Sequence, residues 1–333
     1  MVVFRRGVEM SHFTDFHADD YGLFRKESER ILECCEQGAL TGVSVMTTSP
    51  VVSECMEMLM ERCPQLLLQV HLNFYDGKAL AAPEVPLLTD ENGVFHISFS
   101  RLVLASYIPF MRKKLLPQLE KELWAQMLAM KPWVKEFTCA DRDASVKSAS
   151  GKTEQNGRPD PALTGEGGLR LDGHGHYHMI PIVFDALMNV IRRENLNVTF
   201  IRQPYEELSM YRPIFRKMVG FKPVNLLKVI IINHFVRRNR RKYPFLCSLP
   251  QQVFSGILFS TNLRIENAGA ILPELEKLEK ERGCMGELLF HPGGVYEKED
   301  LDQITIGKDR SFFCHENRRL EYEALHQITK GDS

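Results

Sequence analysis

Apolar and polar positions follow two periodicities along the chain, and stretches with one periodicity alternate with stretches of the other about seven times. Short stretches that alternate with a period of two, or are continuously apolar, predict strands, and longer stretches with a period of roughly 3.6 predict helices. The predicted strands are residues 11–16, 38–48, 66–72, 169–178, 197–201, 254–259 and 286–290. The predicted helices are residues 23–38, 51–62, 100–130, 181–193, 223–235, 272–282 and 318–328. Within the third helix, Pro117 can open a second one.

This alternation of strand and helix predicts a parallel β/α architecture. Residues 66–72 are almost continuously apolar, which is typical of a strand covered on both faces. Residues 78–96 contain two prolines and an Asn-Gly pair and predict a loop. A closed barrel, an incomplete barrel and an open doubly wound sheet are all compatible with the pattern. The chain of 333 residues is long enough for one large α/β domain, which we assign to residues 11–330.

Two stretches depart from the pattern. From residue 135 to residue 168 the chain is rich in small and polar residues and almost without large apolar ones, which predicts a disordered insertion at residues 138–168. The basic run at residues 237–242 follows an apolar helix. We interpret it as the solvated end of a core helix, and the alternative is an anchor at a membrane surface.

Composition narrows the class of protein. A formal net charge of −1 gives no global attraction to nucleic acid or to an acidic membrane, so neither is expected as a partner. The 44% hydrophobic and 26% charged residues are typical of soluble globular proteins. The eight cysteines have irregular spacings that do not resemble a disulfide framework, and neither a signal peptide nor a membrane-spanning run is visible. We therefore expect a cytoplasmic protein with reduced thiols, for which a homodimer stays open.

Four predicted strands carry side chains that can bind metals at or just after their carboxyl ends, namely Asp19 with Asp20, His71, His174, and His291. In parallel β/α folds the carboxyl ends of the strands line the ligand crevice, so residues far apart in sequence become neighbours there. The adjacent carboxylates of Asp19 and Asp20 repel each other unless a cation or a shared proton offsets them. The ordinary alternatives are a solvated Asp-Asp-Tyr-Gly turn and structural histidines at single strand ends.

The densest group of such residues follows the long polar stretch. If residues 169–178 are extended, the period of two places four polar side chains on one face: Asp172, His174, His176 and His178. Three imidazoles would be difficult to satisfy in a core, whereas they suit a polar mouth that carries a metal. Because one strand seldom directs three side chains at one metal, His176 and His178 are expected to support the ligands or to face the substrate.

These residue types fit hydrolytic metal chemistry. One Asp oxygen and two imidazoles form a usual ligand set for a catalytic zinc that keeps a position open for water. Other divalent metals stay open, because ligand type narrows the choice of metal without fixing it. The remaining Asp could accept a proton from water, and a His across the mouth could donate one to a leaving group.

Five blocks between Phe13 and Leu325, taken in order, resemble the YdjC-like carbohydrate deacetylases, a family that includes chitooligosaccharide deacetylase. The blocks are residues 17–22, 71–73, 172–178 with Pro181, 202–204 and 287–293. The resemblance implies an incomplete (β/α) TIM-like barrel of about seven parallel strands, similar to the polysaccharide deacetylases. It also implies a divalent metal, magnesium or zinc.

Carried over by position, the resemblance implies a role for each of several residues. They are Asp20, His71 and His174 as metal ligands, Asp19 as general base, His291 as general acid and Arg202 as the group that orients the base or the substrate. The implied reaction is the metal-dependent hydrolysis of an N-acetyl group on a sugar or short oligosaccharide, similar to a chitooligosaccharide. Asp172, His176 and His178 are expected around the ligands or the substrate.

The chain departs from the family pattern in three places: at His17, where relatives have a smaller polar residue, at Gly175, where they have histidine or glutamine, and in the insertion. None of these removes a proposed ligand. One alternative function is a catalytically silent sugar-binding or scaffold protein on the same barrel, and another is an amide or ester hydrolase of a different substrate class. The presence of all three ligands and of the base favours an enzyme.

Overall fold

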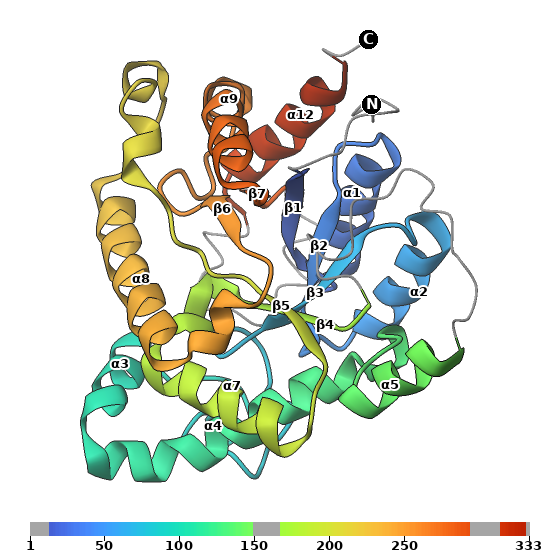
Figure 1. Ribbon diagram of the computed structural model, residues 1–333, viewed down its shortest axis with the longest axis vertical. Coiled ribbons are helices and arrows are strands. Elements are labelled where there is room, and N and C mark those ends of the chain that lie inside the picture. The colour runs from blue at the N-terminus through green and yellow to red at the C-terminus, as the bar shows by residue number, and fades with distance from the viewer. Residues whose placement is uncertain (1–12, 149–166, 294–313, 331–333) are drawn as a thin grey trace.

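The computed structural model describes residues 13–148, 167–293 and 314–330. Seven parallel strands curl into a half-barrel with helices around it, which confirms the predicted incomplete β/α barrel (Figure 1). The strands lie in the order β5-β4-β3-β2-β1-β7-β6. They are β1 (Phe13–Tyr21), β2 (Gly42–Val45), β3 (Leu67–Leu72), β4 (Leu169–Gly173), β5 (Val198–Ile201), β6 (Gln252–Ser255) and β7 (Met285–Phe290).

The helices follow the predicted order, and their ends are set by local chemistry. They are α1 (Arg25–Glu36), α2 (Val52–Arg62), α3 (Phe99–Tyr107), α4 (Pro109–Ala129), α5 (Cys139–Ser148), α7 (Pro181–Arg193), α8 (Pro223–Lys242), α9 (Ile265–Arg282) and α12 (Asn317–Lys330). The break in the long third helix falls at Pro109 and not at Pro117, which lies inside α4. Ile108 is extended there, because a residue that precedes proline disfavours the helical conformation.

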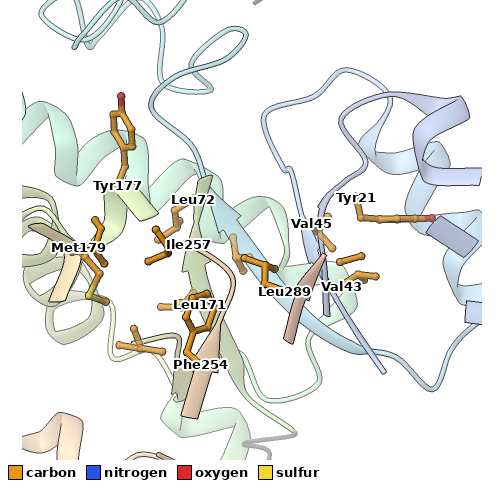
Figure 2. Close-up of a cluster of buried hydrophobic side chains, with 14 of the residues drawn as sticks. Tyr21, Val43, Val45, Leu72, Leu171, Tyr177, Met179, Phe254, Ile257 and Leu289 are labelled. Carbon is orange, nitrogen blue, oxygen red and sulfur yellow. The ribbon is translucent and has the colours of Figure 1, made fainter. Parts of the chain in front are cut away.

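The two faces of the sheet differ in character. The outer face, turned toward the helices, carries apolar side chains such as Val43 and Val45 of β2 and Leu171 of β4, and these belong to one large buried cluster (Figure 2). The inner face carries polar side chains, because alternate positions such as Ser44 and Asp172 point the opposite way and contact each other. The apolar core of this protein therefore lies between sheet and helices, and the interior of the half-barrel is polar.

The polar interior is closed at the amino-terminal ends of the strands. Phe13, Leu67, Phe200 and Met285, from four different strands, form a separate buried apolar cluster. Most of the alternate residues that follow them along the strands are charged or polar, as in β1, where Asp15, His17 and Asp19 come after Phe13. The charged groups are thus shielded from solvent at the amino-terminal ends of the strands, and the interior opens to solvent at the carboxyl ends.

The strand predicted at residues 254–259 is shorter and earlier in the structure, where β6 ends at Ser255. The reason is the buried carboxylate of Glu206. It accepts the backbone N–H groups of Gly256, Ile257 and Leu258 at 3.2, 3.0 and 2.9 Å, so these groups are not available for a strand ladder.

The predicted insertion begins with regular structure. Helix α5 covers Cys139–Ser148, where no ordered element was predicted. Thr138 and Asp141 explain its start, since the Thr138 N–H and hydroxyl donate to Asp141 Oδ2 at 2.8 Å and the Asp141 N–H donates back to Thr138 Oγ1 at 3.2 Å. Residues 149–166, the remainder of that prediction, lie outside the described residues.

The basic run belongs to α8 and is held against the protein instead of being simply solvated. Arg238 and Lys242 contact the Asp185 carboxylate at 3.0 and 2.9 Å, and Arg240 Nε donates to Gln203 Oε1 at 2.6 Å. In the described part of the chain, none of the helices combines the length and the apolar character that crossing a bilayer requires.

Candidate active site

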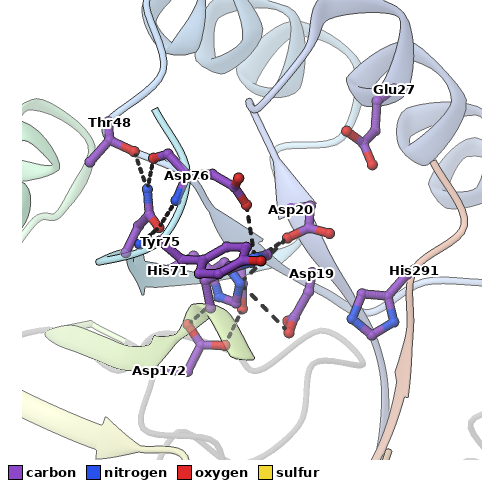
Figure 3. Close-up of polar contacts among 12 residues, drawn as sticks. Asp19, Asp20, Glu27, Thr48, His71, Tyr75, Asp76, Asp172 and His291 are labelled. Atoms are coloured by element: carbon purple, nitrogen blue, oxygen red, sulfur yellow. Dashed lines mark hydrogen bonds and ion pairs between the residues drawn. The ribbon is translucent and has the colours of Figure 1, made fainter. Parts of the chain in front are cut away.

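Asp20, His71 and His174 meet at the carboxyl ends of β1, β3 and β4. One ligand atom from each lies within 4.8 Å of the other two, and all three residues are buried. Asp20 Oδ1 is 2.9 Å from His174 Nδ1 and 3.6 Å from His71 Nε2. Figure 3 shows the carboxylates of Asp19 and Asp20 directed toward the ring of His71. The structure therefore brings together the three residues that the sequence predicted as ligands.

The backbone of Asp20 explains how two adjacent carboxylates face one site. In a regular strand, neighbouring side chains point to opposite faces, so Asp19 and Asp20 could not both face the interior. Asp20 has a φ of 69°, and the register of β1 against β2 shifts between Ala18 and Tyr21. This left-handed residue at the end of β1 turns the second carboxylate toward His71, which Asp19 also faces.

The His71 ring is oriented by Asp172. Its Nδ1 is 3.0 Å from Asp172 Oδ1, and its Nε2, which faces Asp20, has no hydrogen-bond partner among the described residues. A carboxylate on one ring nitrogen fixes the tautomer that leaves the other nitrogen free to coordinate an ion. Burial alone would lower the pKa of His71, but the charges of Asp172 and Asp19 outweigh it and raise this pKa to about 9.

His174 lies between two carboxylates. Its Nδ1 faces Asp20, and its Nε2 is 3.2 Å from Asp76 Oδ2. Burial opposes protonation, but these two carboxylates raise the pKa of His174 well above its ordinary value. Without an ion, the carboxylates of the cluster thus favour the protonated form of both imidazoles. The orphaned His71 nitrogen and this excess of negative charge are the features expected of a site that takes a divalent cation.

The predicted extended run at residues 174–178 is wrong. The strand ends at Gly173, and residues His174–Met179 form a 3-10 turn in which Gly175 and His176 have φ values of 56° and 59°. Because the turn replaces the period of two, the three imidazoles diverge. The ring of His176 packs edge-on against Phe254, and His178 Nε2 is 2.9 Å from the Arg202 carbonyl oxygen.

Burial keeps these two further histidines neutral. It lowers the pKa of His178 to about 4 and that of His176 well below its ordinary value. His178 supports the backbone of Arg202, whereas His176 lines the cavity above the cluster. Neither belongs to the group of three potential ligands.

Asp19 is held by the fully buried Arg202. Arg202 Nη1 donates to both carboxylate oxygens of Asp19, at 3.0 and 3.1 Å, and also contacts Asp172. Its Nε is 2.5 Å from Glu287 Oε1. Burial alone would lower the pKa of Arg202, but its three carboxylate neighbours raise it. One guanidinium thus fixes the predicted base and the residue that orients His71.

A second group of potential ligands consists of His17, Asp19 and Asp172. Its donors are already engaged, since His17 contacts Asp15 at 3.0 Å and Ser44 at 2.8 Å, and Arg202 neutralises both carboxylates. Both ring nitrogens of His17 are thus taken, whereas His71 Nε2 in the first group has no hydrogen-bond partner among the described residues. The fit is therefore better at Asp20, His71 and His174, and the departure at His17 forms part of the network below them.

His291 lines the same cavity as Asp19 and His174, at the end of β7. Its backbone N–H donates to Glu321 Oε2 at 2.6 Å, and this buried carboxylate of α12 also accepts the Leu263 N–H at 2.8 Å. Burial lowers the pKa of His291 to about 4, although Asp20 and Asp19 oppose the shift. The imidazole is neutral at pH 7, which constrains any role as an acid.

Two further residues of the site, Arg318 and Glu287, were given no role by sequence reasoning. Arg318 of α12 donates to Asp20 Oδ2 from Nη1 and Nη2, at 3.2 and 3.1 Å, and contacts Glu27. Nothing in the sequence distinguishes Arg318 from surface helix residues. Glu287 did carry a signal, because it is the only charged residue in the otherwise apolar strand β7.

The loop after β3 is folded by Asn73, which the sequence places directly after the strand. Its Oδ1 accepts the N–H groups of Tyr75 and Asp76 at 2.9 and 3.1 Å, and its Nδ2 donates to Thr48 Oγ1 at 2.9 Å. This turn directs Tyr75 and Asp76 toward the cavity, which both residues line.

Comparisons with known proteins agree with this geometry. The family model described as "YdjC-like protein" matches residues 16–133 and 169–328. A carbohydrate deacetylase of Thermoanaerobacter pseudethanolicus is 36% identical over 84 residues, which are 25% of this chain and 33% of that protein. A carbohydrate deacetylase of Halalkalibacterium halodurans is 30% identical over 91 residues, 27% of this chain and 38% of that protein. The matched segments thus span little more than a third of these curated relatives.

A solved structure shares the fold across nearly the whole chain. It is a protein named as a cellobiose-phosphate cleavage protein, from Enterococcus faecalis V583, with a TM-score of 0.55 and 19% identity. The likeness covers 96% of this chain and 92% of that one, and it supports the barrel architecture alone. Because the family model matches most of the sequence, including every strand of the sheet, the chain belongs to the YdjC-like protein family.

Proposed function

We propose that this chain is a metal-dependent hydrolase that removes the N-acetyl group from a sugar or short oligosaccharide. The observation that carries the proposal is the convergence of Asp20, His71 and His174, with Asp19 beside them on the same cavity. The curated relatives named carbohydrate deacetylases support the sugar as substrate. The intact base and ligand set favour catalysis over a silent sugar-binding or scaffold role.

The metal would be held by Asp20, His71 and His174. Two imidazoles in a set of three favour zinc over magnesium, which prefers oxygen ligands and keeps much of its water. When bound, the ion supplies a Lewis acid for the amide carbonyl and for the attacking water. Arg318 holds the Oδ2 atom of Asp20, so Oδ1 remains directed at the two imidazoles.

Asp19 acts as the general base. It is fixed by Arg202 through both carboxylate oxygens, and it reaches the cavity, where it can accept a proton from the attacking water. The water oxygen then forms a bond to the carbonyl carbon. Arg202 is a positioning residue in this scheme, because its guanidinium is fully buried and contacts carboxylates on three strands.

His291 serves the leaving group. Since its imidazole is neutral at pH 7, it has to accept a proton before it can donate one. Asp19 holds the proton from the water after the attack, and both residues line one cavity. We assign to His291 the transfer of this proton to the amine nitrogen as the C–N bond breaks and acetate is released.

Acetate release tests the function directly. We expect the purified protein, supplied with Zn²⁺ or Mg²⁺, to release acetate from N,N′-diacetylchitobiose. The Asp19→Asn variant should retain its metal and lose at least about a thousandfold in kcat, because the base is lost but the ligands remain. Asp143→Asn, at an exposed surface position, is the matched control. Undiminished turnover by Asp19→Asn would refute the base, and no release from any acetylated sugar would refute the deacetylase.

A further inference from the structure

The cavity above the proposed metal ligands is charged at one end and apolar on one wall. Its volume is about 430 Å³. Asp19, His174 and His291 lie at the charged end, on the strand ends. The opposite wall is formed by α8, which contributes Val224, Leu227, Lys228, Ile231 and Ile232. Four of these five side chains are aliphatic, and together they are named the α8 wall.

The α8 wall exposes apolar surface at the rim of the cavity. Val224 and Leu227 line the cavity, yet they are 56% and 57% exposed to solvent. The helix is fixed there, because Asn225 donates to the Leu258 carbonyl oxygen at 3.2 Å and Val229 and Val236 are fully buried. Exposed apolar surface at the rim of a cavity marks a place where a ligand or partner covers it.

A row of rings connects the metal ligands to this helix. Tyr75 stacks on His174 with ring centroids 6.1 Å apart, Tyr177 lies 6.1 Å from Tyr75, and Phe99 lies 5.4 Å from Tyr177. Phe99 in turn contacts Phe235 of α8, at 6.3 Å. This row of rings leads from the reacting end of the cavity to α8, and Tyr75, Tyr177 and Phe99 also line the cavity.

Sugar hydroxyl groups do not match such a wall. Each buried hydroxyl needs a hydrogen-bond partner, and lysine is the one polar side chain that α8 offers to the cavity. An alkyl or aryl group needs no such partner, and its burial against aliphatic side chains is favourable. The far part of the cavity therefore suits an apolar substituent better than further sugar units.

We propose that the substrate is an N-acetylated amino sugar that carries an apolar aglycone. Its acetamido group lies between Asp19, His174 and His291, and its aglycone packs against the α8 wall. This inference rests on the proposed function, and it specifies the substrate class beyond an N-acetylated sugar. It distinguishes alkyl and aryl glycosides from chitooligosaccharides, whose further units are polar.

Three glycosides of N-acetylglucosamine test the inference by acetate release: the methyl glycoside, the hexyl glycoside and one with a polar ether chain of hexyl length. We expect the hexyl glycoside to have a kcat/KM at least about tenfold above the other two, since burial of several methylene groups exceeds the free energy of a tenfold change. A hexyl glycoside no better than the ether glycoside, or N,N′-diacetylchitobiose preferred over it, would overturn the proposal.

Paired variants of α8 locate the effect. The double variant Val224→Gln, Leu227→Gln should reduce the hexyl preference to about twofold or less. Ile230→Gln is the matched control, because Ile230 is 53% exposed on the same helix but is not among the residues that line the cavity. Loss of the preference in both variants, or in neither, would contradict the assignment.

Binding separates this inference from the proposed function. Hexyl β-glucoside, which has no acetamido group, should bind the wild-type protein in calorimetry and bind the double variant at least about tenfold more weakly. If no glycoside releases acetate but this difference is found, the deacetylase proposal fails and the apolar subsite stands. If acetate is released and hexyl β-glucoside binds both proteins equally, the function stands and the subsite is refuted.

Discussion

The strand-end floor of the cavity and the α8 wall differ in how their side chains are held. Floor residues are buried and held by several polar contacts each, as with Arg202, which contacts Asp19, Asp172 and Glu287. Wall residues are aliphatic and in part exposed, as with Leu227. The floor residues therefore have one well-defined geometry, which a reaction at one particular bond of the substrate requires. The wall, in contrast, would select among substrates only by the apolar area that they bury.

This difference predicts that substitutions in the floor affect stability and metal binding, whereas those in the wall affect substrate preference. Buried ionic networks are costly when one partner is removed, because the other charges remain buried without compensation. Exposed apolar residues carry no such penalty. Two of the predictions below test the floor, and one tests a buried carboxylate behind the sheet.

The largest effect is expected from Arg202→Gln. The substitution leaves three buried carboxylates without their shared cation, which should lower the free energy of unfolding by about 3–5 kcal/mol. Urea denaturation measures the change. Arg319→Gln, which removes surface ion pairs of α12, is the control and should change stability by less than about 1 kcal/mol. Equal effects of the two substitutions would show that the floor network does not hold the barrel together.

A buried carboxylate between α9 and the helix-facing side of the sheet should make stability depend on pH. Glu279 is fully buried against Gly286 and accepts one hydrogen bond, from Thr14 at 2.7 Å, and burial raises its pKa to about 7. The folded state thus binds the proton more tightly than the unfolded chain. This contribution is complete below pH 4.5 and is lost as the pH rises through 7, about 2–3 kcal/mol in all.

The Glu279→Gln variant should therefore lose less stability than the wild type between pH 4.5 and pH 7.5. Urea denaturation across this range measures the two slopes. Glu281→Gln, an exposed position at the end of the same helix, should keep the wild-type slope. A parallel pH dependence in wild type and Glu279→Gln would mean that this carboxyl titrates normally.

A smaller effect is expected at Asp172, which orients the His71 ring. Asp172→Asn should weaken metal affinity by about 10- to 100-fold, because the ring tautomer and direction are no longer fixed by a charge. Competition with a chelator measures the affinity, and excess metal should restore part of the lost turnover. Unchanged affinity would place Asp172 outside the metal site.

The sequence predicted the floor better than the wall, and the reason is local. The carboxyl ends of parallel strands converge, so Asp20, His71 and His174 could be placed together from strand order alone. The turn at Gly175 and His176 was not predictable from alternation, because two left-handed residues end the strand pattern. Arg318 could not be found either, since its partner Asp20 lies 298 residues away in sequence.

The periodicity of apolar positions predicted seven strands in this order along the chain, and the resemblance to the YdjC-like family implied the incomplete barrel. The ends of strands were mispredicted where a side chain takes the backbone N–H groups that would otherwise pair with a neighbouring strand, as Glu206 does after Ser255. The α8 wall escaped notice, because Val224 and Leu227 belong to an ordinary apolar helix pattern. Only the packing of α8 beside the strand ends shows that these side chains line a cavity.

Metal content is the most direct test of the central claim, that Asp20, His71 and His174 hold one divalent cation beside a carboxylate that does not bind it. Protein loaded with Zn²⁺, freed of excess ion and measured by mass spectrometry should contain one equivalent in the wild type and in Asp19→Asn. Asp20→Asn and His174→Ala should each contain less than about a tenth of an equivalent, because two ligands do not retain the ion. One full equivalent in either ligand variant, or its loss in Asp19→Asn alone, would contradict the assignment.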